Sequence, residues 1–233
     1  MASDAANDRH SKAESPDLIA DPVARAEREA RNALTQFDIA IRLIDDFVKE
    51  PARPFKLRPS QIMQLHAAAL EGLSAFAGRY RPAGVEIAGS KHVPPGGGLV
   101  PGLVEELCDY VNDNLKAASP IHLAAYVMWR LNWIHPFDDG NGRTSRMVAY
   151  VVLCVQLGYQ LPGGYTIPEQ IAEDKQPYYQ ALEAADKADR AGKVDVSALE
   201  KLLEGMLARQ LVSLYDSATG NAADAKAREP RFH

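Results

Sequence analysis

The sequence of 233 residues has only two cysteines, Cys108 and Cys154, and both stand in apolar runs without CxxC spacing. Neither a disulfide framework nor a zinc ribbon is indicated, and buried reduced thiols are the simplest interpretation. The longest strongly apolar stretches, 121–134 and 147–157, are too short to span a bilayer. Residues 1–17 are polar and lack the apolar segment of a secretory signal. These absences predict a cytoplasmic protein that has no membrane partner.

The sequence also has no excess of basic residues, because it contains 26 Lys and Arg residues and 31 Asp and Glu residues, for a formal net charge of −5. Nucleic acid is therefore not the expected partner, since phosphate backbones are bound by clustered basic surfaces. A small phosphate site made by two or three arginines is still compatible with this charge. With 46% hydrophobic residues, the chain is long enough for one substantial core.

Apolar residues recur with helical spacing across residues 21–215, which predicts one all-α domain. The segment 80–98 breaks this pattern. There Val85, Ile87 and the Ala88-Gly89 pair predict a flap, either a small β-hairpin or an extended segment. Residues 1–20 and 216–233 are small, polar and charged, and we expect disordered tails there. Helices are expected over 22–49, 59–78, 101–115, 120–133, 143–157, 167–185 with a break near Lys175, and 196–215.

One loop between two apolar helices, HPFDDGNGRTSR at 135–146, has a composition that points to phosphate chemistry. Its Gly-Asn-Gly segment leads directly into a helix. Converging glycine N–H groups and a helix N-terminus together form an anion cradle. Arg143 and Arg146 lie on one face at this N-terminus, where cations are unfavourable unless an anion binds. The pair of arginines therefore suggests a ligand with several phosphates.

Two further residues of this loop fit the same chemistry. Asp139 could hold a Mg²⁺ ion that bridges phosphate oxygens, and His135 could accept a proton from a hydroxyl nucleophile. Each feature alone has an ordinary explanation: a helix cap for the histidine, an N-cap for the aspartate, a turn for the glycines and a solvated surface for the arginines. Their coincidence within twelve residues is not explained in that way.

The loop matches in full the signature of the Fic family, HPFx(D/E)GNGRxxR, with Asp138 at the variable position. The resemblance continues in LHAAALEGLSAFAGRYR and VEIAGSKHVPP before it, and in QPYYQALEAAD and DVSALEKLLEGML after it. It covers about 56–207, and so implies a Fic core there with 21–50 as an added N-terminal helix. It also implies a protein adenylyltransferase, which transfers AMP from Mg-ATP to a Ser, Thr or Tyr hydroxyl of a target protein.

The resemblance assigns roles to the site residues. Tyr178 would line an adenine pocket, although helix packing explains this tyrosine equally well. A flap around 85–93 would pair with an extended target segment, and its candidate residues are Val85, Ile87, Gly89 and His92. In the loop, His135 would be the general base, Asp139 the Mg²⁺ ligand, Gly140, Asn141 and Gly142 the α/β-phosphate cradle, Arg143 a phosphate contact and Arg146 the γ-phosphate contact.

Regulation is less clearly encoded. Many Fic proteins carry an inhibitory (S/T)xxxE(G/N) helix, and this sequence has no clean copy. Glu29 and Glu204 are the nearest candidates, but Arg25 and Glu200 stand where Ser or Thr would be expected. An ordinary charged helix face is the favoured interpretation of both. Inhibition would then come from a separate antitoxin chain or from one of these glutamates, and a homo-oligomer is compatible with either.

Two alternatives to AMP transfer follow from the same residues. The fold could use another donor, such as a different nucleoside triphosphate or a phosphocholine compound, or could remove AMP from a modified protein. A nucleotide-binding interaction module without useful catalysis is the alternative from another class. The intact His135 argues against a module, because nucleotide binding alone does not need a base.

Overall fold

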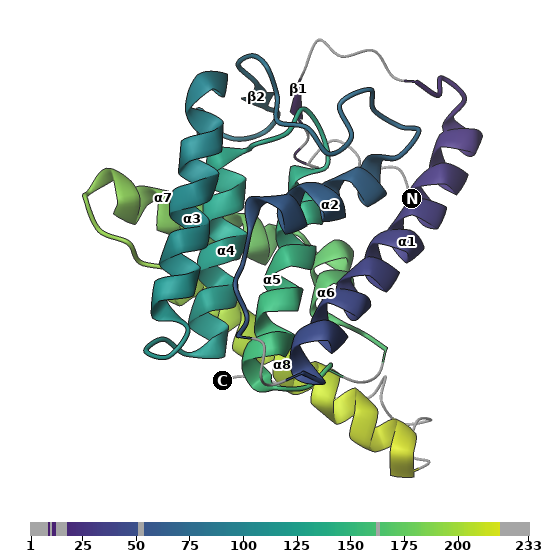
Figure 1. Ribbon diagram of the computed structural model, residues 1–233, viewed down its shortest axis with the longest axis vertical. Helices are drawn as coiled ribbons and strands as arrows, with labels where there is room; N and C mark the ends of the chain where they lie inside the picture. The colour runs from purple at the N-terminus through teal and green to yellow at the C-terminus, as the bar shows by residue number, and fades with distance from the viewer. Residues whose placement is uncertain (1–8, 10, 13–17, 51–53, 162–163, 220–233) are drawn as a thin grey trace.

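The computed structural model describes residues 9, 11–12, 18–50, 54–161 and 164–219, and the predicted all-α class is confirmed for this part of the chain (Figure 1). The helices are α1 (Pro22–Val48), α2 (Pro59–Leu70), the short 3-10 helix η2 (Gly97–Leu99), α3 (Val100–Asn114), α4 (Pro120–Ile134), α5 (Asn141–Leu157), α6 (Ile167–Glu173), α7 (Gln176–Arg190) and α8 (Ser197–Thr219). The strands are β1 (Ser11–Lys12) and β2 (Glu86–Ile87).

Several helix boundaries follow from local capping chemistry that the sequence predicts. Asp21 accepts hydrogen bonds from the N–H groups of Val23 and Ala24 at the start of α1. Ser119 Oγ accepts one from the His122 N–H, 3.0 Å away, at the start of α4. Gly158, with φ +77°, ends α5 in the left-handed region that glycine enters at little cost. These caps fix where the helices around the candidate site begin and end.

The helices α4 and α5 form the centre of the molecule and are buried along most of their lengths. The helices α1 and α2 pack against α5, while α3, α7 and α8 pack against α4. Because both central helices are enclosed, the loop that joins them is held from both ends. Among the described residues, no helix combines the length and apolar character needed to cross a membrane.

The expectation of a helix over 59–78 is wrong in its second half, because α2 ends at Leu70. Gly72 adopts φ +69°, and the chain turns back over α2. The N–H of Gly78 then donates to His66 Nδ1, 2.9 Å away. This hydrogen bond fixes the turn against α2, close to the candidate site.

Of the two forms expected for the flap, the β-hairpin is wrong. Of the flap, only β2 is a strand, and its partner is β1 from the N-terminal segment. The two strands are antiparallel, with Ser11 opposite Ile87. The expected disordered tails are therefore wrong for Ser11–Lys12, and also for 216–219, which extend α8. The other tail residues, 1–8, 10, 13–17 and 220–233, lie outside the described residues.

Both cysteines are buried and unpaired, as the sequence predicts. Burial raises the pKa of the Cys108 thiol to about 12, and it also raises the pKa of Cys154. Neither thiol is a thiolate near neutral pH, so both act as small apolar core residues.

Candidate active site

The loop between α4 and α5 places His135 at the C-terminus of α4 in a left-handed conformation, with φ 52° and ψ 60°. The residue before a proline is disfavoured in the right-handed helical region, and Pro136 follows directly. A non-glycine residue in the left-handed region costs about 1–3 kcal/mol and persists only where its surroundings hold it. In this conformation the chain leaves α4, and the imidazole of His135 lines a cavity.

The imidazole of His135 is in the state that a general base requires. Burial lowers the pKa of His135 to about 4, so the ring is neutral at neutral pH. Its Nδ1 lies 3.3 Å from the Asn132 carbonyl oxygen, which only an N–H can approach favourably. The proton is therefore on Nδ1, and Nε2 keeps its lone pair. This lone pair faces the hydroxyl oxygen of Ser11, 2.8 Å away.

Arg81 holds the first residues of the loop between α4 and α5 through hydrogen bonds to their backbone. It is a buried arginine, and its Nε donates to the His135 carbonyl oxygen at 2.7 Å. Its backbone N–H donates to the Pro136 carbonyl at 3.0 Å, and its guanidinium also bonds the carbonyls of Ala83 and Pro95. One side chain thus ties the base of the flap to the strained residue, which explains how the strain is maintained.

The Gly-Asn-Gly segment forms the N-terminus of α5, as the sequence predicts. Gly140 adopts φ +74°, and a Cβ atom there would lie 2.3 Å from Leu70 Cδ2. Asn141 accepts the Phe137 N–H at Oδ1 and donates from Nδ2 to the Phe137 carbonyl, at 2.9 and 2.7 Å. The asparagine therefore closes the loop, and its backbone N–H and that of Gly142 lie in the first turn of α5.

His66 forms the floor under this loop. Its ring stacks on Phe137 with centroids 3.7 Å apart, and its Nε2 donates to the Asp139 carbonyl at 3.0 Å. Burial lowers the pKa of His66 to about 4, so this ring is also neutral at neutral pH. The contacts from α2 therefore support the loop through packing and hydrogen bonds.

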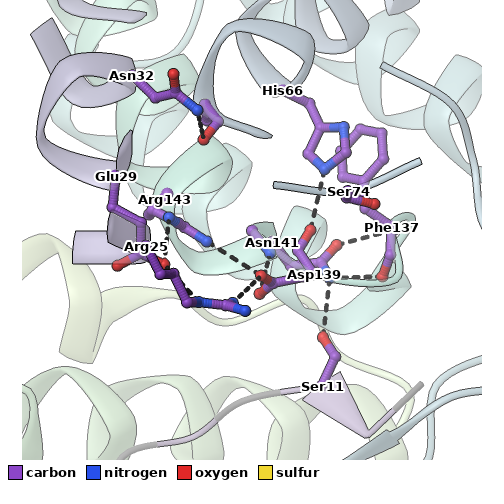
Figure 2. A network of polar contacts seen from close by, with 12 residues as sticks. Ser11, Arg25, Glu29, Asn32, His66, Ser74, Phe137, Asp139, Asn141 and Arg143 are labelled. Atoms are coloured by element: carbon purple, nitrogen blue, oxygen red, sulfur yellow. Dashed lines mark hydrogen bonds and ion pairs between the residues drawn. The ribbon is translucent and has the colours of Figure 1, made fainter. Parts of the chain in front are cut away.

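Four charged side chains alternate in sign beside the N-terminus of α5 (Figure 2). Asp139 Oδ2 lies 3.2 Å from Arg143 Nη2 and 3.8 Å from Arg25 Nη2. Glu29 Oε1 lies 3.6 Å from Arg143 Nη1 and 3.4 Å from Arg25 Nε. Their side chains are 29–40% exposed, and ion pairs at such exposure contribute about 0–1 kcal/mol each. The network is weak enough to rearrange around an anionic ligand.

The position of α1 brings two of these four residues to the site. Arg25, Glu29 and Asn32 share one face of α1, since they are spaced four and three residues apart. Asn32 is buried and donates to the carbonyls of Ala69 and Glu71 at 3.2 and 2.8 Å. This contact fixes α1 on the end of α2, so that Glu29 reaches Arg143.

His135, the Gly-Asn-Gly segment and the four charged side chains line one cavity of about 440 Å³, a volume in the usual range for small-molecule sites. Of the predicted site residues, those lining it are His135, Asp139, Gly140, Asn141, Gly142, Arg143, Arg146, Tyr178, Ile87, His92 and Glu29. Val85 and Gly89 lie in the flap beside the cavity but do not line it, and Glu204 is exposed on α8. The predicted residues of the loop therefore line the cavity, and Glu29 lines it from α1.

Two predicted residues have structural contacts that limit their roles. The phenol of Tyr178 is fully buried and accepts a hydrogen bond from Asn132 Nδ2 at 2.7 Å. His92 Nε2 lies 2.7 Å from the Trp133 carbonyl oxygen, and its ring packs on the Trp133 ring. His92 therefore fastens the flap to the end of α4.

Asp139 is the residue that fits a Mg²⁺ ion. Its carboxylate lines the cavity and is 40% exposed, beside a helix N-terminus and two arginines suited to phosphates. Mg²⁺ is commonly held by one or two carboxylates together with phosphate oxygens and waters. The described residues contain no group of three or more His, Cys, Asp or Glu side chains placed to hold a metal. A single carboxylate of this kind suits an ion that arrives with its phosphates.

Several site residues could not have been singled out from the sequence. Arg81 and Asn132 act through buried contacts with no local motif. Arg25 stands out in the sequence only as a departure from an expected Ser or Thr. Arg9 and Ser11 lie in a segment whose composition predicts disorder. The connection of these residues to the site depends on tertiary contacts, which no local sequence pattern predicts.

Comparison with known proteins agrees with the fold and the loop. The model of the Fic/DOC family matches residues 56–153. A protein adenylyltransferase Fic from Drosophila willistoni is 29% identical over 163 residues, which are 69% of this chain and 30% of that protein. The chain thus spans about a third of the length of the curated relatives it matches.

Two solved structures share the fold. A Fic domain-containing signalling protein from Bacteroides thetaiotaomicron has a TM-score of 0.63 at 22% identity, and the match covers 81% of this chain and 73% of that one. BepC, an effector protein from Bartonella tribocorum with bound AMPPNP, has a TM-score of 0.51 at 20% identity, over 81% of this chain and 88% of that one. The family-model match over residues 56–153, the complete loop signature and the helical fold around it all indicate similarity to the Fic/DOC family.

Proposed function

We propose that this protein is a protein adenylyltransferase, which transfers AMP from ATP to a protein hydroxyl and releases pyrophosphate. One observation carries the proposal: a neutral His135, with Nε2 free to accept a proton, faces the same cavity as the N-terminus of α5 and its arginines. The matched relatives named protein adenylyltransferase Fic support this activity, as does the nucleotide analogue bound in BepC.

In the proposed reaction, the oxygen of a Ser, Thr or Tyr side chain attacks the α-phosphorus of ATP. A new P–O bond forms, the bond from the α-phosphorus to the bridging oxygen breaks, and pyrophosphate leaves. His135 Nε2 takes the hydroxyl proton. The N–H groups of Asn141 and Gly142 and the guanidinium groups of Arg143 and Arg146 neutralise the phosphate charge.

The remaining parts of the cavity have supporting roles in this proposal. Asp139 would hold a Mg²⁺ ion, which neutralises charge on phosphate oxygens when bound. Tyr178 and its neighbours on α7 would face the adenine. The flap, with Val85, Ile87 and Gly89, would take an extended target segment by strand addition in place of β1. A cytoplasmic location, a separate antitoxin chain and a homo-oligomer stay predictions from the sequence.

The test is to incubate the chain with ATP, Mg²⁺ and a protein lysate, and then to identify adducts by mass spectrometry. AMP on Ser, Thr or Tyr residues, with pyrophosphate released, is the expected result. A phosphate adduct, or an adduct formed only from another nucleotide or phosphocholine donor, would replace AMP transfer by that reaction. Loss of AMP from a modified protein would indicate removal, and nucleotide binding without any adduct would indicate a binding module.

We also propose that Glu29 restrains this activity by competing with phosphate oxygens for Arg143. Replacing Glu29 by Ala removes the carboxylate 3.6 Å from Arg143 Nη1 and keeps a good helix former in α1. We expect AMP transfer to rise about fivefold, which corresponds to ~1 kcal/mol for one half-exposed ion pair. The measurement is the initial rate of adduct formation at low ATP concentration.

Two matched glutamates serve as controls for Glu29. Glu27 pairs with Arg31 on the exposed side of α1, and Glu204 is exposed on α8 outside the cavity. Glu27→Ala and Glu204→Ala are expected to leave the rate unchanged. An equal rise in Glu27→Ala, or no rise in Glu29→Ala, would show that Glu29 does not restrain the site.

A further inference from the structure

The N-terminal segment of the chain occupies the edge of the flap that a target would use. The strand β1 pairs antiparallel with β2, with Ser11 opposite Ile87 and Lys12 opposite Glu86 (Figure 1). Strand addition of this kind is a common way to bind an extended peptide, because the main chain supplies affinity while the side chains enter pockets. Here the added strand belongs to the same molecule, and one of its side chains is a hydroxyl.

That hydroxyl lies at the catalytic base. Ser11 Oγ is 2.8 Å from His135 Nε2. Asn141 Nδ2 donates to the same oxygen at 3.4 Å (Figure 2). Since Nε2 is the unprotonated nitrogen, Ser11 donates its proton towards the base. This is the hydrogen bond that a nucleophilic hydroxyl needs before proton transfer. The oxygen also lies beside the first residue of α5, where the phosphate cradle begins.

A second anchor holds the segment on the other side of the cavity. The guanidinium of Arg9 stacks over the Tyr179 ring, 4.4 Å from its centroid, and forms an ion pair with Glu183. The backbone N–H of Arg9 donates to the Tyr179 hydroxyl at 3.2 Å. Both partners come from α7. Ser11 therefore lies between a side-chain anchor on α7 and a backbone anchor on β2.

We propose that Ser11 is an acceptor that this protein modifies in itself, with the chain's own β1 acting as the bound substrate strand. The proposal rests on the AMP-transfer function above. Ser11 Oγ forms a bond to the α-phosphorus of ATP, the bond from that phosphorus to the pyrophosphate oxygen breaks, and pyrophosphate leaves. The hydroxyl proton passes to His135 Nε2. The product is an AMP phosphodiester on Ser11.

Because Ser11 belongs to the same chain as the site, it is favoured as an acceptor over the hydroxyl groups of other proteins. A tethered group reaches the site at an effective concentration that is typically millimolar or higher, and a hydroxyl aligned with its base gains further from orientation. An external target strand must displace β1 from β2 before it can bind. Self-modification of Ser11 and modification of other proteins therefore compete for one edge of the flap.

The experiment uses the full chain with ATP and Mg²⁺, followed by cleavage after glutamate and fragment mass spectrometry of residues 1–14. This peptide contains two hydroxyl residues, Ser3 and Ser11, so Ser3→Ala is the matched control for Ser11→Ala. We expect AMP on Ser11 in the wild type and in Ser3→Ala, and at least a tenfold loss of self-modification in Ser11→Ala. Ser11→Ala should still modify other proteins at the wild-type rate or faster.

A mixing arm tests whether the transfer is intramolecular. His135→Asn chains, distinguished by mass, are mixed with active chains. The His135→Asn chains should stay unmodified. The first-order rate constant for Ser11 modification of the active chains should be independent of protein concentration. AMP on Ser11 of the His135→Asn chains, at a rate rising with concentration, would overturn the intramolecular proposal. AMP on other residues or proteins with Ser11 unmodified would overturn the Ser11 assignment and leave AMP transfer intact. No AMP on any protein would remove the proposed function, and the Ser11 assignment with it.

Discussion

Replacing Gly140 by Ala should destabilise the protein by about 3 kcal/mol and abolish AMP transfer. The residue adopts φ +74°, which costs a side-chain-bearing residue about 1–2 kcal/mol. The new Cβ would also lie 2.3 Å from Leu70 Cδ2, and overpacking of a closed site costs about 1–3 kcal/mol. Relief of this clash must move either α2 or the first turn of α5. The check is the free energy of unfolding in urea together with the rate of adduct formation.

Gly158 provides a control that separates the two costs. It has a nearly identical φ of +77° at the other end of α5, but a Cβ there meets nothing within 4 Å. Gly158→Ala should therefore lose only about 1–2 kcal/mol and keep its activity. Equal losses of stability in the two variants would mean that the close approach of Leu70 does not constrain the loop.

Replacing His135 by Asn should lower AMP transfer about 10²–10⁴-fold while nucleotide binding is retained. Asparagine tolerates the left-handed conformation that position 135 adopts, so the loop is preserved. Its amide cannot accept the hydroxyl proton, and general base catalysis contributes about this much to rate. The measurement is the initial rate of adduct formation, with nucleotide affinity determined by calorimetry on the same variant.

The matched control and the pH profile sharpen the assignment of His135. His122 lies outside the cavity and contacts Glu200 and Tyr110, so His122→Gln should keep full activity. For the wild type, the group is an effective base while it is neutral, and burial lowers the pKa of His135 to about 4. The value of kcat/KM should therefore stay level as pH falls from 7 and decline only near pH 4. A decline centred near 6.5 would show that the base is not the buried imidazole described here.

The loop from His135 to Arg146 and the helices on both sides of it could be predicted because their signals are local. Apolar periodicity marks α4 and α5, Ser119 and Gly158 mark two of their ends, and the motif supplies its own residue order. The predicted break near Lys175 is present for the same reason, since α6 ends and α7 begins around it. Such features depend on residues a few positions apart, and tertiary contacts do not override them.

The errors arose where distant parts of the chain meet. The end of α2 depends on Gly78 returning to His66, and the partner of β2 is a strand more than seventy residues earlier in the chain. The position of Glu29 beside Arg143 depends on the buried amide of Asn32, which fixes α1 against α2. Composition correctly describes the N-terminal segment as polar, but it cannot show that two anchors order Arg9 and Ser11 across the cavity.

The most direct test of the central claim compares the label that the wild-type chain transfers to protein from α-labelled ATP and from γ-labelled ATP. AMP transfer by His135 predicts that protein takes up the α-label and none of the γ-label, and that His135→Asn takes up neither above background. Transfer of the γ-label, or α-label incorporation that persists undiminished in His135→Asn, would contradict the account.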